Sequence, residues 1–273
     1  MALKSISNFV SFANPFSKEF KIDCKYFSDL SLRHKIVTVA CTIFAALLTI
    51  GIGAPAAFHW CVNKLLKNPV KIQMRSAERG DPKEQYNLAL RYEKGQDVKQ
   101  SNDEKVKWLE KAAKQGYADA QNDLGYCYEY GLGVGQSAKI AAEWYEKAAK
   151  QGDKVAQYNL GLCYLYGRGV EQSNELAAEW LEKAAKQGDE PAQYELGERY
   201  WEGKGVEQSD ELAAEWLEEA AKQGHADAQY ELGLCYLNGK GVRKSDKMAE
   251  SLLWEAYIRG HKDAARTFPF ISA

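Results

Sequence analysis

Cysteine can bind a metal or form a disulfide, and histidine can bind a metal. Three of the six cysteines and two of the four histidines recur at a fixed spacing. Cys127 and Cys163 are 36 residues apart, Cys235 lies 72 residues further on, and His225 and His261 are again 36 apart. Equivalent residues of stacked helical units lie about 8 to 10 Å or more apart, whereas a disulfide needs Cα atoms within about 7 Å. We therefore expect free thiols, which favour a reducing compartment, and no metal site at the histidines.

Catalytic and cofactor-binding motifs are absent from the region that carries these residues. It contains no HExxH, CxxC, GxSxG or SxxK sequence. Glycine pairs such as Gly131-Leu-Gly133-Val134 lack both the preceding strand and the Lys-Ser or Lys-Thr of a phosphate-binding loop. They are typical of turns that end a helix on a left-handed residue, a conformation that Asp97 in the first such loop also tolerates. The sequence therefore predicts a protein that is not an enzyme and needs no cofactor.

The elements that must position these residues repeat with the same period of 36 residues. Within residues 117–152, Ala120, Leu124 and Tyr128 lie four apart on one helical face, and Trp144 or Tyr145 belongs to the apolar face of a second helix. Each unit is therefore predicted to be a helical hairpin, and hairpins that bury their apolar faces only against neighbours form a solenoid. We expect an all-α fold, an α/α solenoid wound as a right-handed superhelix, with one amino-terminal transmembrane helix.

A family resemblance follows from the pattern A-x-x-x-L-G-x-x-Y-x-x-G-x-G-V and then A-A-x-W-x-x-K-A-A-x-x-G. It resembles the Sel1-like repeat, a relative of the tetratricopeptide repeat. The five expected units are 81–116, 117–152, 153–188, 189–224 and 225–260. Because an open-ended stack needs caps, residues 63–80 are expected to form a linker and a capping half-repeat helix, and residues 261–273 a carboxy-terminal cap.

The tryptophans of the second helices are expected to be equivalent core wedges of successive hairpins. They are Trp108, Trp144, Trp180 and Trp216. The last unit replaces this tryptophan with Leu252 and has Trp254 two residues on, which leaves the register of its second helix open.

The resemblance implies that the first helix of each unit lines a concave groove that binds another protein or peptide. The residues expected there are Tyr126, Tyr130, Tyr158, Leu162, Leu165, Tyr166, Tyr194, Glu198, Trp201, Tyr230, Leu234 and Leu237, with Tyr86, Leu90, Glu93 and Asn122 in the matching slots of the first two units. Aromatic residues in grooves supply many binding hot spots. The tyrosine shared by four of the five units is equally consistent with packing between repeats.

The amino-terminal region contains an apolar run, residues 36–62, that is long enough to span a bilayer. We place the membrane-embedded part at Ile36 to Ala57, before Trp60 and a group of lysines, and treat residues 1–35 as a separate segment. A cleavable signal peptide is the alternative, but 35 residues of mixed charge precede the run, which is unlike an ordinary leader. Lysine and arginine are balanced on the two sides of the span, so the charges do not fix its orientation.

Taken together, these patterns predict a single-pass membrane adaptor whose repeat domain lies on the cytoplasmic side, in a reducing compartment. The net charge of −2 gives no basic field for nucleic acid. The alternative is a secreted or periplasmic repeat protein that acts on host cells or the cell wall, with or without hydrolase activity. Secreted members of the resembled family staple each hairpin with a cysteine pair, and this chain does not.

Overall fold

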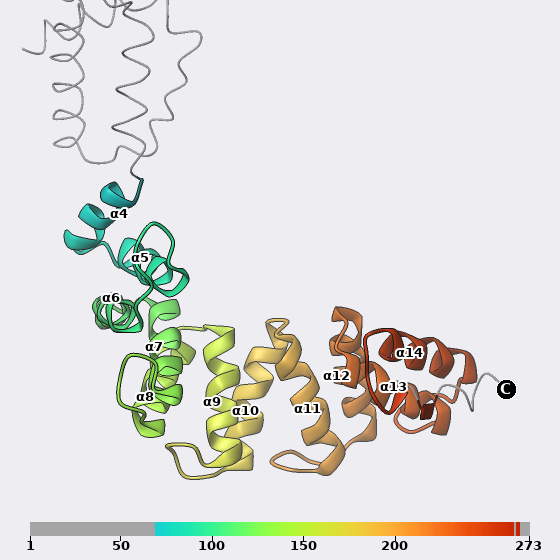
Figure 1. Cartoon of the computed structure of the whole chain (residues 1–273). Coiled ribbons are helices and arrows are strands. Elements are labelled where there is room, and N and C mark those ends of the chain that lie inside the picture. Colours follow the sequence, from blue (N-terminus) through green and yellow to red (C-terminus); the bar gives the residue numbers. More distant parts are fainter. Residues whose placement is uncertain (1–68, 265, 268–273) are drawn as a thin grey trace, which may run out of the picture. The chain divides into compact units, whose positions relative to one another are not determined.

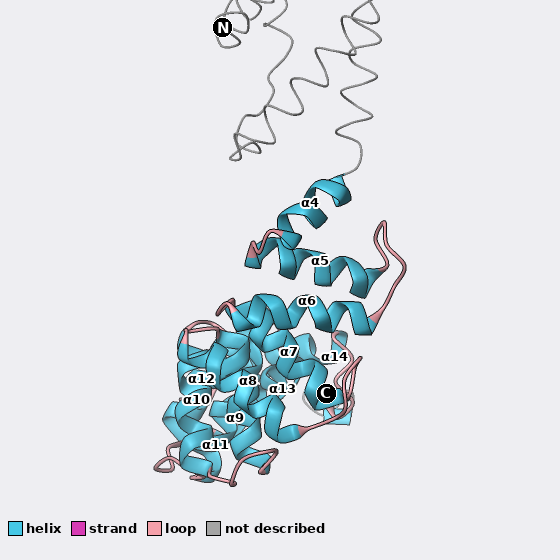
Figure 2. Ribbon diagram, turned by 90° about the vertical axis from the view of Figure 1, so that its left-hand side faces the viewer, coloured by secondary structure: helices cyan, strands magenta, loops and turns pink. Residues whose placement is uncertain are grey.

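A computed structural model describes residues 69–264, 266 and 267, and the regular elements in these residues are α-helices joined by loops (Figures 1 and 2). A boundary between two compact units falls at Pro69 and Val70, and the carboxy-terminal unit is the one described. Three predicted parts of the chain lie outside the described residues: the segment 1–35, the membrane span Ile36 to Ala57, and the last residues of the carboxy-terminal cap. Within 69–264, 266 and 267, no helix combines the length and apolar character that crossing a bilayer requires.

In the described residues, five helical hairpins follow one another after a single helix (Figure 1). The single helix is α4 (Pro69–Glu78). The hairpins are α5 (Pro82–Lys94) with α6 (Asn102–Lys114), α7 (Ala118–Tyr130) with α8 (Ala138–Lys150), α9 (Lys154–Tyr166) with α10 (Asn174–Lys186), α11 (Glu190–Glu202) with α12 (Asp210–Gln223), and α13 (Ala226–Asn238) with α14 (Asp246–Ile258). The described residues therefore form an all-α repeat solenoid, as the sequence predicts.

Local sequence explains where the helices begin and end. Each second helix begins after a serine, such as Ser173, whose hydroxyl accepts the backbone N–H three residues on. Each first helix ends on a left-handed glycine, such as Gly167 with φ 64°, whose N–H donates to the carbonyl of Cys163. The predicted turn is confirmed, and Asp97 has a positive φ of 61° in the first unit.

The buried core joins the second helix of one unit to the first helix of the next: Leu160 clusters with Tyr145 of α8, and Leu181 clusters with Leu196 of α11. Leu160 and Leu181 are buried to 1% and 0% exposure, and Tyr145 is likewise fully buried. Within one hairpin, Gly161 of α9 permits the close approach of Leu181 of α10, because a Cβ at Gly161 would lie 2.9 Å from Cγ of Leu181. The second helix of the last unit keeps the same register, because Leu253 takes the buried slot.

The prediction that the tryptophans are equivalent core wedges is wrong. Only Trp108, 9% exposed, counts as buried, while Trp144, Trp180 and Trp216 are half-buried. Trp180 packs against the core that contains Tyr145 of the preceding unit, and its outer ring face lies under the Lys183 ammonium, 4.0 Å from the ring centroid. Helical periodicity places two adjacent residues near the core, and here the second of them enters it.

A row of glutamine side chains connects the hairpins through buried hydrogen bonds. Gln157 donates to the carbonyl oxygen of Ala149 in the preceding unit at 3.1 Å and accepts from Gln187 of its own hairpin at 2.8 Å. Gln85 makes the equivalent bond to Ala77 of α4 at 3.0 Å. Helix α4 therefore takes the place of a preceding second helix and covers the amino-terminal end of the stack.

Candidate binding surface

The first helices α5, α7, α9, α11 and α13 follow one another side by side, so their outward residues form a continuous surface, the first-helix face. The Asn159 amide donates to the Asn122 amide oxygen at 3.0 Å across α7 and α9. The rings of Tyr194 and His225 stack at 4.4 Å between centroids across α11 and α13. Residues one turn apart, such as Tyr126 and Tyr130, share one side of a helix.

The most exposed aromatic side chains of this face are Tyr126, Tyr130 and Tyr166, which we call the tyrosine cluster. They are 45%, 54% and 59% exposed. The rings of Tyr126 and Tyr130 lie 4.5 Å apart between centroids, and the Arg168 guanidinium lies 5.2 Å from the Tyr166 ring centroid. Large aromatic rings that stay exposed on a folded domain are available to bind another molecule.

The base of the cluster is organised by Glu129, which joins two units. Its carboxylate accepts the Tyr145 hydroxyl at 2.8 Å and pairs with Arg168 at 2.7 Å. Burial, followed by the bond to Glu129, raises the pKa of Tyr145. The hydroxyl therefore stays protonated and holds Glu129 in place.

The remaining predicted binding residues of this face, apart from Leu165, are half-buried. They are Tyr158, Leu162, Tyr194, Glu198, Trp201, Tyr230, Leu234 and Leu237, and Tyr86, Leu90, Glu93 and Asn122 belong to the same class. The ring centroids of Tyr86 and Tyr117 lie 5.3 Å apart, and those of Tyr230 and His261 lie 4.2 Å apart. Tyr117 directly precedes α7, and His261 follows α14. These contacts match the packing alternative for the shared tyrosine.

The assignment of Leu165 to the exposed groove needs correction. Its side chain is only 5% exposed, and its backbone carbonyl accepts the Gln172 amide at 2.8 Å. The equivalent slot holds Glu129 and Trp201 in the neighbouring units, which are half-buried. Leu165 is therefore mostly covered, and the part of it that stays accessible lines a pocket.

Three carboxylates of the last two units lie half-buried on this face. Burial is the main cause that raises the pKa of Glu195, Glu198 and Glu231, and for Glu198 repulsion from Glu231 and Glu202 adds to it. Trp201 lies beside them, with the Lys240 ammonium 3.9 Å from its ring centroid. The carboxy-terminal part of the first-helix face is thus acidic, whereas the part over α7 and α9 is aromatic.

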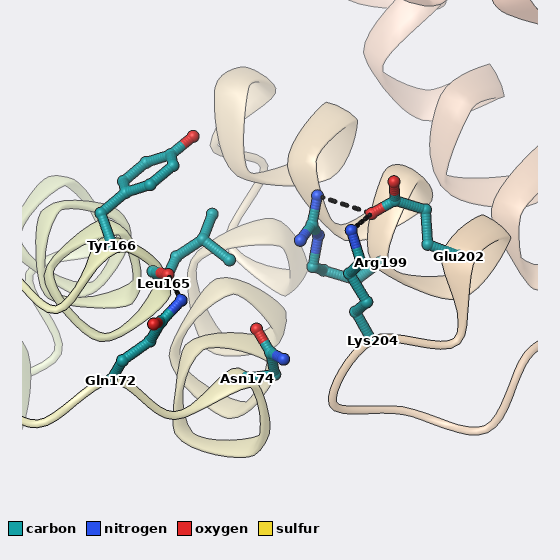
Figure 3. Close-up of a pocket in the computed structure, with 7 residues that line it drawn as sticks. All are labelled: Leu165, Tyr166, Gln172, Asn174, Arg199, Glu202 and Lys204. Atoms are coloured by element: carbon teal, nitrogen blue, oxygen red, sulfur yellow. Dashed lines mark hydrogen bonds and ion pairs between the residues drawn. The ribbon is translucent and has the colours of Figure 1, made fainter.

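A pocket of ≈ 350 Å³ opens between α9, the loop that follows it, and α11. It is lined by Leu165, Tyr166, Gln172, Asn174, Arg199, Glu202 and Lys204. Figure 3 places Arg199 between the residues of the α9 side and Glu202. Glu202 pairs with Arg199 at 3.2 Å and with Lys204 at 3.1 Å.

The cysteines and histidines have structural places in the described part of the chain. Cys127, Cys163 and Cys235 are buried free thiols, and burial raises the pKa of Cys163 to about 11 and that of Cys235 to about 12. His225 begins α13, where its Nδ1 accepts the Ala228 N–H at 3.2 Å. Among residues 69–264, 266 and 267, no three metal-ligating side chains converge.

The hairpin units can be compared with known families now that their geometry is described. The Sel1 repeat matches residues 85–117, 118–153, 154–189, 190–225 and 226–261, which is more than half of the chain. This chain belongs to the Sel1 repeat family. The curated proteins contain no significant match.

Two solved Sel1-type structures show how far the likeness extends. A protective antigen of uropathogenic Escherichia coli with an SLR fold is 33% identical with a TM-score of 0.70, over 72% of this chain and 42% of that protein. A Sel1 repeat protein from Oxalobacter formigenes is 36% identical with a TM-score of 0.67, over 73% of this chain and 58% of that protein. The chain thus spans about half the length of these two proteins.

Sequence reasoning assigned no binding role to three charged residues that support the first-helix face of the Sel1 units. Glu129 and Arg168 bridge two Sel1 units beneath the tyrosine cluster, and Arg199 lines the pocket from a slot that holds cysteine in three other units. The replacement of the repeated cysteine by Arg199 could have been noticed in the sequence. The ion pair of Glu129 could not have been predicted from the sequence, because its partner Arg168 lies 39 residues away.

Proposed function

We propose that this protein is an interaction scaffold whose first-helix face forms a concave groove for a segment of another protein. The observation that carries the proposal is the tyrosine cluster, because exposed tyrosines supply rigid contact area at low entropic cost. A soluble face with no binding role tends to replace such rings with charged side chains.

The second helices supply the contrast that favours this face. Their outward residues form ion pairs one helical turn apart, such as Glu146 with Lys150 at 2.6 Å and Glu182 with Lys186 at 2.7 Å. Exposed pairs of this kind contribute little to stability and remain well hydrated. A partner would have to strip water from these charges, which makes the second helices the less favourable docking side.

Family membership supports binding rather than catalysis. Sel1 units build an open repeat surface, whereas an enzyme of small substrates needs convergent polar groups in a closed site. The E. coli relative is described as a protective antigen, which favours the alternative that this chain is a secreted or periplasmic protein acting on host cells or the cell wall. Both alternatives use the same groove and differ in compartment.

We further propose that residues 36 to 57 anchor the scaffold in a membrane. The support is the uncharged run itself, which exceeds the roughly 20 residues that a span needs. Alkaline carbonate extraction of cell membranes tests the anchor. The intact protein should stay in the pellet, and intact protein in the soluble fraction would contradict the anchor without affecting the groove.

Site-specific photo-crosslinking tests the groove directly. A photoreactive phenylalanine analogue is placed at Tyr130, Tyr166 or Trp201 in the full chain and, as matched controls on the second helices, at Glu179 or Glu215. We expect a discrete crosslinked partner from the first three positions and none from the controls. The reverse pattern would place the working surface on the second helices.

A further inference from the structure

Three half-buried carboxylates on the first-helix face of the last two units form what we call the acidic patch. They are Glu195 and Glu198 on α11 and Glu231 on α13. Within residues 69–264, 266 and 267, none of the three forms an ion pair or a side-chain hydrogen bond. The second helices differ, because their carboxylates Glu146 and Glu182 each contact a lysine one turn on. The acidic patch is therefore able to bind a cation that another molecule supplies.

The cations beside the acidic patch are shared with a further carboxylate. Arg199 interacts electrostatically with Glu195 and Glu198, and it also pairs with Glu202 at 3.2 Å. Lys204 pairs with the same Glu202 carboxylate at 3.1 Å. The carboxylates of this region thus outnumber its paired cations, and the excess charge is negative.

The two histidines of this region do not neutralise the patch. Nδ1 of each accepts the backbone N–H three residues on, at 3.2 Å for His225 and 3.1 Å for His261. A ring nitrogen that accepts a hydrogen bond carries no proton, so both imidazoles are neutral in this arrangement. Their Nε2 atoms lie 3.9 Å from Glu190 and 3.4 Å from Asp227, which are carboxylates outside the patch.

Aromatic rings accompany the carboxylates, and one ring already contacts an ammonium group of this chain. Burial raises the pKa of Tyr194, and Glu198 and Glu231 are among the charges that add to the rise, so the hydroxyl lies near both. The Lys240 ammonium lies 3.9 Å from the ring centroid of Trp201 on the same helix. Aromatic rings next to carboxylates favour a bound lysine or arginine side chain.

The acidic side of the first-helix face borders the tyrosine cluster. Tyr166 of α9 and Glu202 of α11 line the same pocket, from its two sides (Figure 3). A segment that crosses from α9 to α11 therefore meets exposed aromatic rings first and unpaired carboxylates next. Its own residues must match this order.

We propose that the acidic patch binds a lysine or arginine side chain of the partner protein, and that an apolar or aromatic neighbour of this residue lies on the tyrosine cluster. Charge complementarity selects this partner, because a basic side chain relieves the repulsion among the carboxylates and forms charge-assisted hydrogen bonds with them. The inference rests on the proposed function, because it names the chemistry of the segment that the first-helix face binds.

Selection from a phage-displayed library of random heptapeptides tests this chemistry without knowledge of the partner. The immobilised full chain is compared with the double variant Glu198→Gln/Glu231→Gln and with the matched control Glu179→Gln/Glu215→Gln on the second helices. Both variants lose two negative charges, so a general effect of net charge is the same in each. Glutamine keeps the shape of glutamate, so both are expected to fold.

We expect peptides selected on the natural protein and on the control to be enriched in lysine or arginine next to an aromatic or apolar residue. The affinity of a selected peptide, measured by fluorescence anisotropy, should fall about tenfold or more in Glu198→Gln/Glu231→Gln, the loss expected for a charge-assisted hydrogen bond. Peptides without basic enrichment, no selected peptide, or equal affinity for the two double variants would overturn the inference.

Failure of this inference is distinguishable from failure of the groove. If crosslinking places a partner on the first-helix face and that partner binds Glu198→Gln/Glu231→Gln with unchanged affinity, the basic-residue site is wrong and the groove stands. If basic peptides depend on the acidic patch while the partner crosslinks only to the second helices, the site stands and the groove is wrong.

Discussion

Adjacent residues on one helix of this protein differ in burial, because their side chains point in different directions around the helix axis. Trp180 and Leu181 are adjacent, yet the leucine is fully buried and the tryptophan covers the junction with the preceding unit. Leu165 and Tyr166 are also adjacent, and one is 5% exposed while the other is 59% exposed. Neighbouring residues in the sequence can therefore have different roles, one in the core and the other on the surface.

Replacement of Leu181 by alanine is expected to lower the free energy of unfolding by about 2 to 5 kcal/mol, because it leaves a cavity in a closed core. Leu176 of the same helix is 39% exposed, and Leu176→Ala is expected to change stability by no more than about 0.5 kcal/mol. Urea denaturation followed by circular dichroism measures both. Similar losses for the two variants would contradict the placement of the core.

The half-buried carboxylates make a pH-dependent contribution whose sign follows from their environment. Burial raises the pKa of Glu198 above its ordinary value of 4.5, with added repulsion from Glu231 and Glu202. The folded state therefore holds this proton more tightly than the unfolded state. The resulting stabilisation is fully present below the ordinary pKa and is lost as pH rises through the folded value.

Glu198→Gln is accordingly expected to be more stable than the natural protein at neutral pH and to lose that advantage as the pH falls towards 4.5. Thermal unfolding between neutral pH and pH 4.5 measures the difference. Glu215→Gln, at an exposed position of α12, is the control. Its stability should change with pH in the same way as that of the natural protein. An advantage of Glu198→Gln that persists at acid pH would show that titration is not its cause.

At the scale of elements, the glycine loops set the distance between successive hairpins. Gly169 has a φ of 76°, and a Cβ there would overlap the carbonyl of Ala138 at the start of α8 in the preceding unit. A Cβ at Gly133 would likewise overlap the carbonyl of Asn102 at the start of α6. The first unit has only α4 before it and carries Asp97 at this place. Stacking between units therefore demands glycine, and its absence marks the end of the array.

Gly169→Ala and Gly188→Ala separate crowding from backbone strain. Both glycines have a φ of 76°, but a Cβ at Gly188 meets nothing within 4 Å. The shared strain of a left-handed alanine costs about 1 to 2 kcal/mol in each variant. Gly169→Ala is expected to lose about 1 to 3 kcal/mol more through overpacking, as measured by urea denaturation. Equal losses would mean that the loop does not rest on the preceding unit.

At the scale of the whole molecule, periodicity in the sequence predicts the all-α solenoid, the left-handed turns and the helix-start role of His225. The same periodicity could not decide between Trp144 and Tyr145 for the core, because both lie near one helical face and only packing against the neighbouring unit separates them. The family resemblance placed Leu165 in the groove, because a resemblance assigns a whole helix to a surface and does not give the burial of each side chain. Contacts across units, such as Arg168 with Glu129, arise from the stack and leave no local pattern in the sequence.

The central claim, that the first-helix face is the interaction surface, is tested most directly by the affinity of the crosslinked partner for surface variants of the full chain. Tyr166→Ala and Trp201→Ala should each weaken binding by about 1 to 3 kcal/mol with unchanged helical content, because truncated aromatic anchors lose hot-spot contacts. Charge reversal at Glu179 and Glu182 on α10 should leave the affinity unchanged. Normal binding by the aromatic variants together with loss of binding on charge reversal would contradict the account.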